Sequence, residues 1–192
     1  SVRVGAPEHA AVPPLALRAS QGPAAVVSGS CSTATLAQVE RMSASCPTFQ
    51  VDALALGDGQ DVVGNAIAWA SGYLPDVPVL VSASAPPEVV AQAQRELGTD
   101  RAAQLVEDAL ASIAAGLLEL GVTRLVVAGG ETSGAVVNRL GIGEVRIGPA
   151  IAPGVPWIFP TDRSGLVLAL KSGNFGGRDF FVEALSGNLA SA

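Results

Sequence analysis

The sequence predicts an α/β domain of three layers, with helices on both faces of a largely parallel or mixed sheet. Short, continuously apolar segments alternate along the chain with longer segments whose apolar residues recur every three or four positions. The first pattern is typical of strands buried on both faces, and the second of amphipathic helices. Hydrophobic residues make up 49% of the 192 residues, enough for a substantial core. Alternation of the two patterns favours a sheet covered on both sides.

The first regular element is expected after a proline-rich opening. Pro7, Pro13 and Pro14 interrupt any helix or strand in residues 1–22. We interpret residues 1–22 as a linker or domain-entry segment and residues 23–192 as the folded domain.

The N-terminal half then alternates strand and helix. Residues 24–27 form a short apolar strand that stops at a Ser-Gly-Ser turn, and Thr35 with Gln38 resembles a helix-start pair. Residues 49–56 alternate in the manner of a strand. The helix over 101–120 has the clearest apolar face, and Gly121 follows it where a helix-ending glycine belongs. The full prediction for this half is strands at 24–27, 49–56 and 77–82, and helices ending near Met42 and spanning 61–71, 87–97 and 101–120.

The C-terminal third is richer in glycine and proline. An apolar strand at 125–128 stops at Gly129-Gly130, after which Thr132 or Ser133 is expected to cap a short helix. Three further strands and a terminal helix are predicted at 144–147, 157–159, 166–170 and 178–185.

Charge and composition argue against several classes of function. The net charge is −6, and the eleven Lys and Arg residues do not cluster, so binding of nucleic acid is not expected. No apolar run approaches the ~20 residues that span a bilayer, and no secretory signal pattern is visible, so we expect no membrane association and a cytoplasmic location. Two cysteines, Cys31 and Cys46, and one histidine, His9, do not form a disulfide framework or a zinc site. No metal ligand is predicted.

Three glycine-rich turns follow apolar strands. They are residues 28–33 (SGSCST), 129–134 (GGETSG) and 171–177 (KSGNFGG). Glycine lets the backbone approach a ligand closely, and helix N-termini beyond strand ends present free N–H groups to anions. The same residues are also ordinary loop chemistry. Because neither a Walker sequence nor a Gly-x-Gly-x-x-Gly fingerprint is present, the residues alone leave a phosphate site and a structural role equally open.

A resemblance narrows these choices. Residues 126–136 (VVAGGETSGAV) and 168–176 (LALKSGNFG) are similar to motifs of the four-carbon acid sugar kinases. Shorter matches occur in family order at 27–32, 148–149, 153–157 and 179–181. The resemblance covers nearly the whole chain from Ala24.

The resemblance implies an ATP- and Mg²⁺-dependent kinase acting on the terminal hydroxyl of 3-oxo-tetronate, threonate or erythronate. In this family an N-terminal domain binds the sugar acid and a C-terminal domain binds ATP; the chain resembles only the latter. The Asp-Asp dipeptide of the sugar-binding domain has no counterpart in this sequence. We therefore expect the sugar acid to bind only through the absent N-terminal domain, and the isolated chain to be inactive. A homo-oligomer is compatible with the sequence.

Residue roles follow from the same resemblance. Lys171 is the candidate catalytic residue, through neutralisation of phosphate charge; pairing with a carboxylate is the alternative. Glu131 is expected to bind ribose or Mg²⁺, although a glutamate there also suits the helix dipole. The residues expected to bind nucleotide are Ser28, Gly29, Ser30, Gly129, Gly130, Glu131, Thr132, Ser133, Ser172 and Gly173.

Two other functions remain open from the sequence. A glycerate kinase-like enzyme is one, because Gly-Gly-Glu-Thr also ends a strand in part of that group; the sequence of residues 171–176 argues against it. A non-catalytic nucleotide-binding module is the other.

Overall fold

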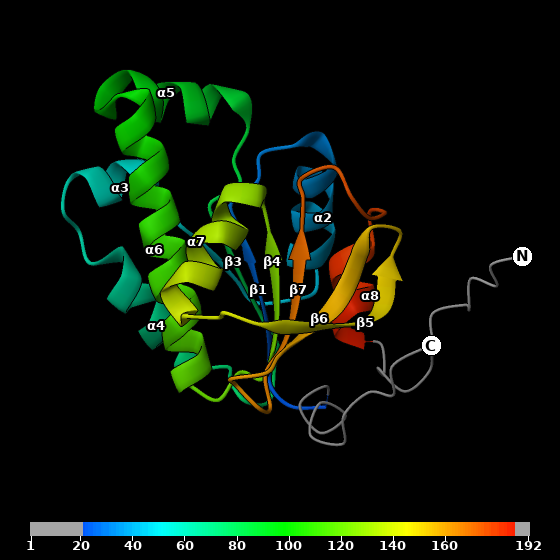
Figure 1. The fold of residues 1–192 in the computed structure, drawn as a ribbon. Helices are drawn as coiled ribbons and strands as arrows, with labels where there is room; N and C mark the ends of the chain where they lie inside the picture. Colours follow the sequence, from blue (N-terminus) through cyan, green and yellow to red (C-terminus); the bar gives the residue numbers. More distant parts are fainter. Residues whose placement is uncertain (1–20, 187–192) are drawn as a thin grey trace, which may run out of the picture.

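A mixed sheet of seven strands lies at the centre of residues 21–186, the part of the chain that the computed structural model describes (Figure 1). Nearly all of the expected linker, and His9, lie outside the described residues. The strands are β1 (Ala24–Ser28), β2 (Thr48–Gln50), β3 (Val79–Ser82), β4 (Arg124–Ala128), β5 (Val145–Ala152), β6 (Val155–Pro160) and β7 (Val167–Lys171). The helices are α2 (Thr33–Ser43), α3 (Ala53–Gly57), α4 (Val62–Ser71), α5 (Pro87–Leu97), α6 (Thr99–Glu119), α7 (Gly130–Leu140) and α8 (Phe180–Ser186).

The strand order is β2-β3-β1-β4-β7-β6-β5. The first five strands in this order run parallel to one another. β6 is antiparallel to β7, and β5 is antiparallel to β6. The predicted α/β class is confirmed, and the sheet is mixed.

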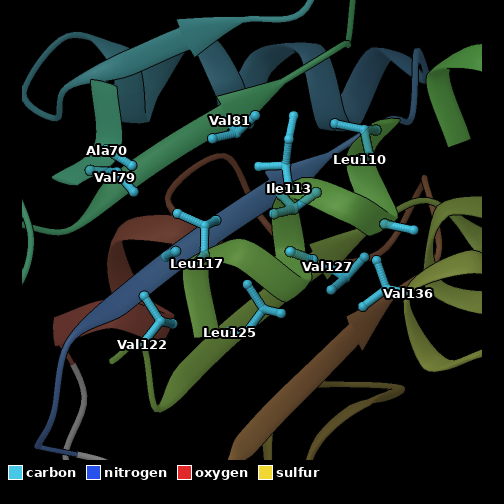
Figure 2. Close-up of a cluster of buried hydrophobic side chains, with 14 of the residues drawn as sticks. Ala70, Val79, Val81, Leu110, Ile113, Leu117, Val122, Leu125, Val127 and Val136 are labelled. Carbon is cyan, nitrogen blue, oxygen red and sulfur yellow. The ribbon is translucent and has the colours of Figure 1, made fainter. Parts of the chain in front are cut away.

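Two cores, one on each face of the sheet, explain the three layers. Along β1, Ala25 and Val27 belong to one core while Val26 belongs to the other, as the alternation of side chains along a strand requires. α4, α6 and α7 cover the first face, and α2 and α8 cover the second (Figure 1). In the first core, Ile113 of α6 and Val136 of α7 lie over Val127 of β4 (Figure 2). The apolar residues that recur along the helix predicted over 101–120 thus form the face of α6 that packs on the sheet.

The strand predicted over residues 49–56 is wrong beyond its start. β2 ends at Gln50, and α3 begins at Ala53. Asp52 is the reason, because its side chain accepts a hydrogen bond (2.8 Å) from the N–H of Leu54 and so caps the new helix. The alternation of apolar residues continued past this cap and hid the change of structure.

The predicted cap of the helix after β4 is also wrong. α7 begins at Gly130, and its N-cap is Gly129, which makes no side-chain cap hydrogen bond. Gly129 has φ +124°, a conformation that favours glycine, so the chain turns directly from strand into helix. Thr132 and Ser133 consequently lie in the first turn of α7. No helix of residues 21–186 combines the length and apolar character needed to cross a membrane.

Candidate functional site

The three glycine-rich turns meet at one edge of the sheet. β1, β4 and β7 are neighbours and parallel, so their carboxyl ends lie together. The N–H of Gly29 donates to the carbonyl oxygen of Ala128 (2.9 Å), and the N–H of Gly129 donates to that of Lys171 (2.8 Å). We call the three segments the β1 turn (residues 28–33), the β4 turn (129–134) and the β7 turn (171–177). The three turns that follow apolar strands in the sequence therefore lie together in the fold.

A pocket of about 330 Å³ lies beside the first two turns. Its walls are residues 29–31 of the β1 turn, residues 129–132 of the β4 turn, and Ala103, Val106 and Glu107 of α6. One wall is thus built from small residues and backbone, and the other from a helix side. The free N–H groups at the start of α7 lie at this pocket, as an anion site requires.

Glycine is needed where the two turns pack against each other. A Cβ on Gly129 would lie 2.8 Å from Oγ1 of Thr132, and a Cβ on Gly29 would clash with the same atom. Thr132 is buried, so it fills the space that the two glycines leave. Gly130 differs, because a Cβ there would meet nothing within 4 Å. Its open side is available to a ligand.

Lys171 is buried beneath the β7 turn. Its ammonium donates to Oγ1 of Thr35 (3.0 Å) and to the carbonyl oxygens of Ser172 (3.1 Å) and Gly173 (2.8 Å). Oγ of Ser32 also donates to the carbonyl of Gly173 (2.6 Å), so the turn is tied to the start of α2. A lysine ammonium has three donors, and all three are used here. Burial lowers the pKa of Lys171 to about 8.

The structure divides the residues predicted from the sequence into two sets. Those that line the pocket are Gly29, Ser30, Gly129, Gly130, Glu131 and Thr132. Those that do not line it are Ser28, Ser133, Lys171, Ser172 and Gly173.

Ser28, Ser133 and Gly173 of the second set lie in different surroundings. Ser28 is fully buried, and its Oγ shares a hydrogen bond with Oγ of Ser84 (2.8 Å). Ser133 is buried with no hydrogen-bond partner for Oγ within the described part of the chain. A Cβ on Gly173 would lie 2.7 Å from Oγ of Ser30. The β7 turn therefore supports the β1 turn from outside the pocket.

The helix wall was missed by the sequence analysis. Ala103, Val106 and Glu107 are spaced so that they share one side of α6. Glu107 and Asp108 are the only adjacent acidic residues in the sequence, and an acidic residue beside the apolar face of a helix was the available signal. Burial, and then the negative charges of Glu131 and Asp108, raise the pKa of Glu107.

A larger groove continues from the pocket between α6 and α7. Its volume is about 850 Å³, and it shares Glu107 and Glu131 with the pocket. Farther along, it is lined by Ser112, Asn138 and Arg139. The two carboxylates thus stand where the pocket opens into the groove.

Comparisons with known proteins agree on one family. Residues 25–181 match the family model described as a nucleotide-binding C-terminal domain. The chain is 52% identical over 168 residues to a 3-oxo-tetronate kinase of Cupriavidus necator, covering 87% of this chain and 38% of that protein. It is 52% identical over 165 residues to a 3-oxo-tetronate kinase of Methylobacterium radiotolerans, covering 85% of this chain and 39% of that protein.

A solved structure of a Haemophilus influenzae protein has the same fold. Its TM-score is 0.81 at 39% sequence identity, over 86% of this chain and 40% of that one. The chain therefore spans about two fifths of the length of the relatives that it matches.

Proposed function

The chain belongs to the family of nucleotide-binding C-terminal domains, and we propose that it is the ATP-binding part of a sugar-acid kinase. The acceptor that we propose is the terminal hydroxyl of 3-oxo-tetronate, because the similar proteins carry that name; threonate and erythronate are the alternatives. The observation that carries the proposal is the pocket at the start of α7, where backbone N–H groups and small residues meet at the carboxyl ends of β1 and β4.

The β4 turn is the proposed phosphate site. The N-terminus of an 11-residue helix offers free N–H groups and the positive end of the helix dipole, both of which favour an anion. Gly130 leaves that approach unobstructed. Ser30 and Thr132 line the same pocket and have hydroxyl groups suited to phosphate oxygens.

Magnesium is proposed to accompany the nucleotide. Mg²⁺ is usually held through one or two carboxylates together with substrate phosphates. Glu131 lies in the first turn of α7, is exposed and lines the pocket, so its carboxylate is suitably placed for this role. Within residues 21–186 no group of three or more His, Cys, Asp or Glu side chains is arranged to hold a metal ion.

The acceptor is proposed to be held by the part of the relatives that this chain does not match. Phosphoryl transfer depends chiefly on alignment of the acceptor oxygen with the γ-phosphate and on neutralisation of charge. A domain that holds ATP with Mg²⁺ supplies half of that arrangement. The acceptor pocket and any residue that accepts the proton of the hydroxyl would come from a part that corresponds to the three fifths of the relatives' length that this chain does not match.

Calorimetric titration of the 192-residue chain with ATP and ADP, each with Mg²⁺, tests the nucleotide-binding part of the proposal. We expect binding in the micromolar to millimolar range, about −8 to −4 kcal/mol, because no Lys or Arg among the described residues lines the pocket to pair with the phosphates. Circular dichroism of the same sample checks that the chain is folded. A folded chain without detectable binding at millimolar nucleotide would contradict the proposal.

A further inference from the structure

The pocket has two chemically different walls, and only one of them suits phosphate. The turn wall offers backbone N–H groups and the hydroxyls of Ser30 and Thr132. The α6 wall offers two apolar side chains, Ala103 and Val106, and the carboxylate of Glu107. A nucleotide is divided in the same way, into a charged polyphosphate and a neutral nucleoside. The walls therefore suggest which end of the ligand lies where.

The charge of Glu107 disfavours a phosphate group beside it. Among the described residues that line the pocket there is no Lys or Arg to offset a carboxylate against a polyphosphate. Two like charges in contact are unfavourable, and the partial burial of Glu107 strengthens the repulsion. A neutral group that donates hydrogen bonds therefore suits the place beside Glu107, because an ionised carboxylate only accepts them. The ribose 2′- and 3′-hydroxyls are the neighbouring donors of a nucleotide that meet this requirement.

The position of Glu107 fits the sugar better than that of Glu131 does. Glu131 is in the first turn of α7, next to the N–H groups proposed to hold phosphate. Glu107 belongs to the α6 wall with Ala103 and Val106 and is half-buried, whereas Glu131 is exposed. Both carboxylates also line the groove between α6 and α7. If the nucleoside of the bound nucleotide extends from the phosphate site toward this groove, its ribose lies beside Glu107.

We infer that Glu107 accepts hydrogen bonds from the ribose hydroxyls of the bound nucleotide and thereby selects ribonucleotides over deoxyribonucleotides. This inference rests on the proposed nucleotide-binding function and adds a specificity-determining residue to it. A carboxylate with two oxygens matches a pair of adjacent hydroxyls, and hydrogen bonds to a charged group are stronger than those between neutral groups.

The experiment compares ATP with 2′,3′-dideoxy-ATP, each with Mg²⁺, on the 192-residue chain. Wild type is expected to bind ATP about tenfold more tightly than the dideoxy analogue. Glu107→Gln, which keeps the shape and removes the charge, is expected to bind the analogue as well as wild type does and to lose most of the preference for ATP. Glu119→Gln is the matched control, because it makes the same change at an exposed glutamate of α6 that lines neither the pocket nor the groove, and it should keep the full preference. Thermal unfolding of each variant checks that it is folded.

Each outcome has a definite meaning. Binding of neither nucleotide to the folded wild-type chain would overturn the proposed function and the inference together. Equal affinity of wild type for ATP and its dideoxy analogue would overturn the inference alone, and this comparison needs no variant. An equal loss of affinity for both nucleotides in Glu107→Gln would assign Glu107 to the cation or to folding, and would also overturn the inference.

Discussion

Lys171 is a cation whose hydrogen-bond partners are all uncharged oxygens. Its side chain is 0% exposed, and its three donors go to Oγ1 of Thr35 and to two carbonyls of its own turn. The ammonium also lies 6.0 Å from the centre of the Phe181 ring. In this arrangement Lys171 links β7 to the start of α2 and has no donor left for a phosphate. Its effect on nucleotide would act through the shape of the β7 turn.

The pH dependence of stability tests the burial of Lys171. The folded-state pKa is lowered to about 8 from an ordinary 10.5, so between these pH values the unfolded state binds more protons than the folded state. Stability contributed by this residue must therefore rise with pH across that window, by at most about 3 kcal/mol. Lys171→Met should lose the rise. Urea unfolding at pH 7, 8.5 and 10 measures it.

Stability must be compared between wild type and Lys171→Met, because Cys46 also makes stability depend on pH. Burial raises the pKa of its thiol to about 11, which lowers stability as pH rises from about 9. This contribution opposes that of Lys171 and is common to wild type and variant. The difference between their stabilities isolates Lys171, and a difference that stays constant from pH 7 to 10 would contradict a lowered pKa.

A substitution at Gly130 tests the proposed phosphate site. A side chain at Gly130 would enter open space and not protein, so Gly130→Val should obstruct the ligand with little cost to the fold. The residue has helical backbone and does not require positive φ, so backbone strain is not expected. We expect nucleotide affinity to fall at least about tenfold, or about 1.4 kcal/mol.

Gly143→Val is the matched control for Gly130→Val. Gly143 is exposed, also meets nothing within 4 Å of an added Cβ, and does not line the pocket. Its substitution should leave affinity unchanged in the same calorimetric titration. Equal affinities of Gly130→Val and wild type would move the phosphate site elsewhere.

α6 contributes side chains both to the hydrophobic core and to the wall of the pocket. Leu110, Ile113 and Leu117 are fully buried on the side that faces the sheet (Figure 2). Ala103, Val106 and Glu107 lie nearer the start of the helix and form the pocket wall. The helix therefore carries the wall on a scaffold that is fixed by apolar packing.

Leu117→Ala should separate these two roles. Removal of a fully buried leucine side chain costs about 2–5 kcal/mol, because it loses apolar burial and leaves a cavity. Leu117 does not line the pocket, so the nucleotide affinity of the folded chain should stay within about twofold of wild type. Urea unfolding and calorimetry at low temperature measure the two effects. A large loss of affinity without a loss of stability would contradict this division of α6.

The whole molecule is expected to bind nucleotide without catalysing transfer. The chain spans about two fifths of its kinase relatives, and alignment of acceptor with γ-phosphate is the main source of rate. We predict no acid-dependent ADP release by the 192-residue chain with 3-oxo-tetronate, threonate or erythronate. A protein that joins this chain to the part of the relatives that it does not match should turn over at least one of them in the same coupled assay. Turnover by the chain alone would refute the proposal that the acceptor is held by that other part, and no turnover by the joined protein would refute the kinase assignment.

Much of the fold could be predicted because it depends on local patterns. Apolar strands and amphipathic helices follow from side-chain periodicity, which each segment carries in its own residues. Two predictions were wrong because a single residue set the local structure. Asp52 caps α3 inside a segment predicted as a strand, and Gly129 is the N-cap of α7 without a side-chain hydrogen bond. The three turns were also visible, since each combines glycines and hydroxyls at a strand end.

The sequence alone determined the α/β class and the three turns at the carboxyl ends of strands, because both depend on short-range patterns. The tertiary structure decided which residues share a pocket. Parallel pairing of β1 with β4 joined two of the turns, packing of α6 on the same face added Glu107, and the burial of Lys171 removed its ammonium from the pocket. Such contacts join residues far apart in the chain, and they depend on how the layers pack, which no local pattern specifies.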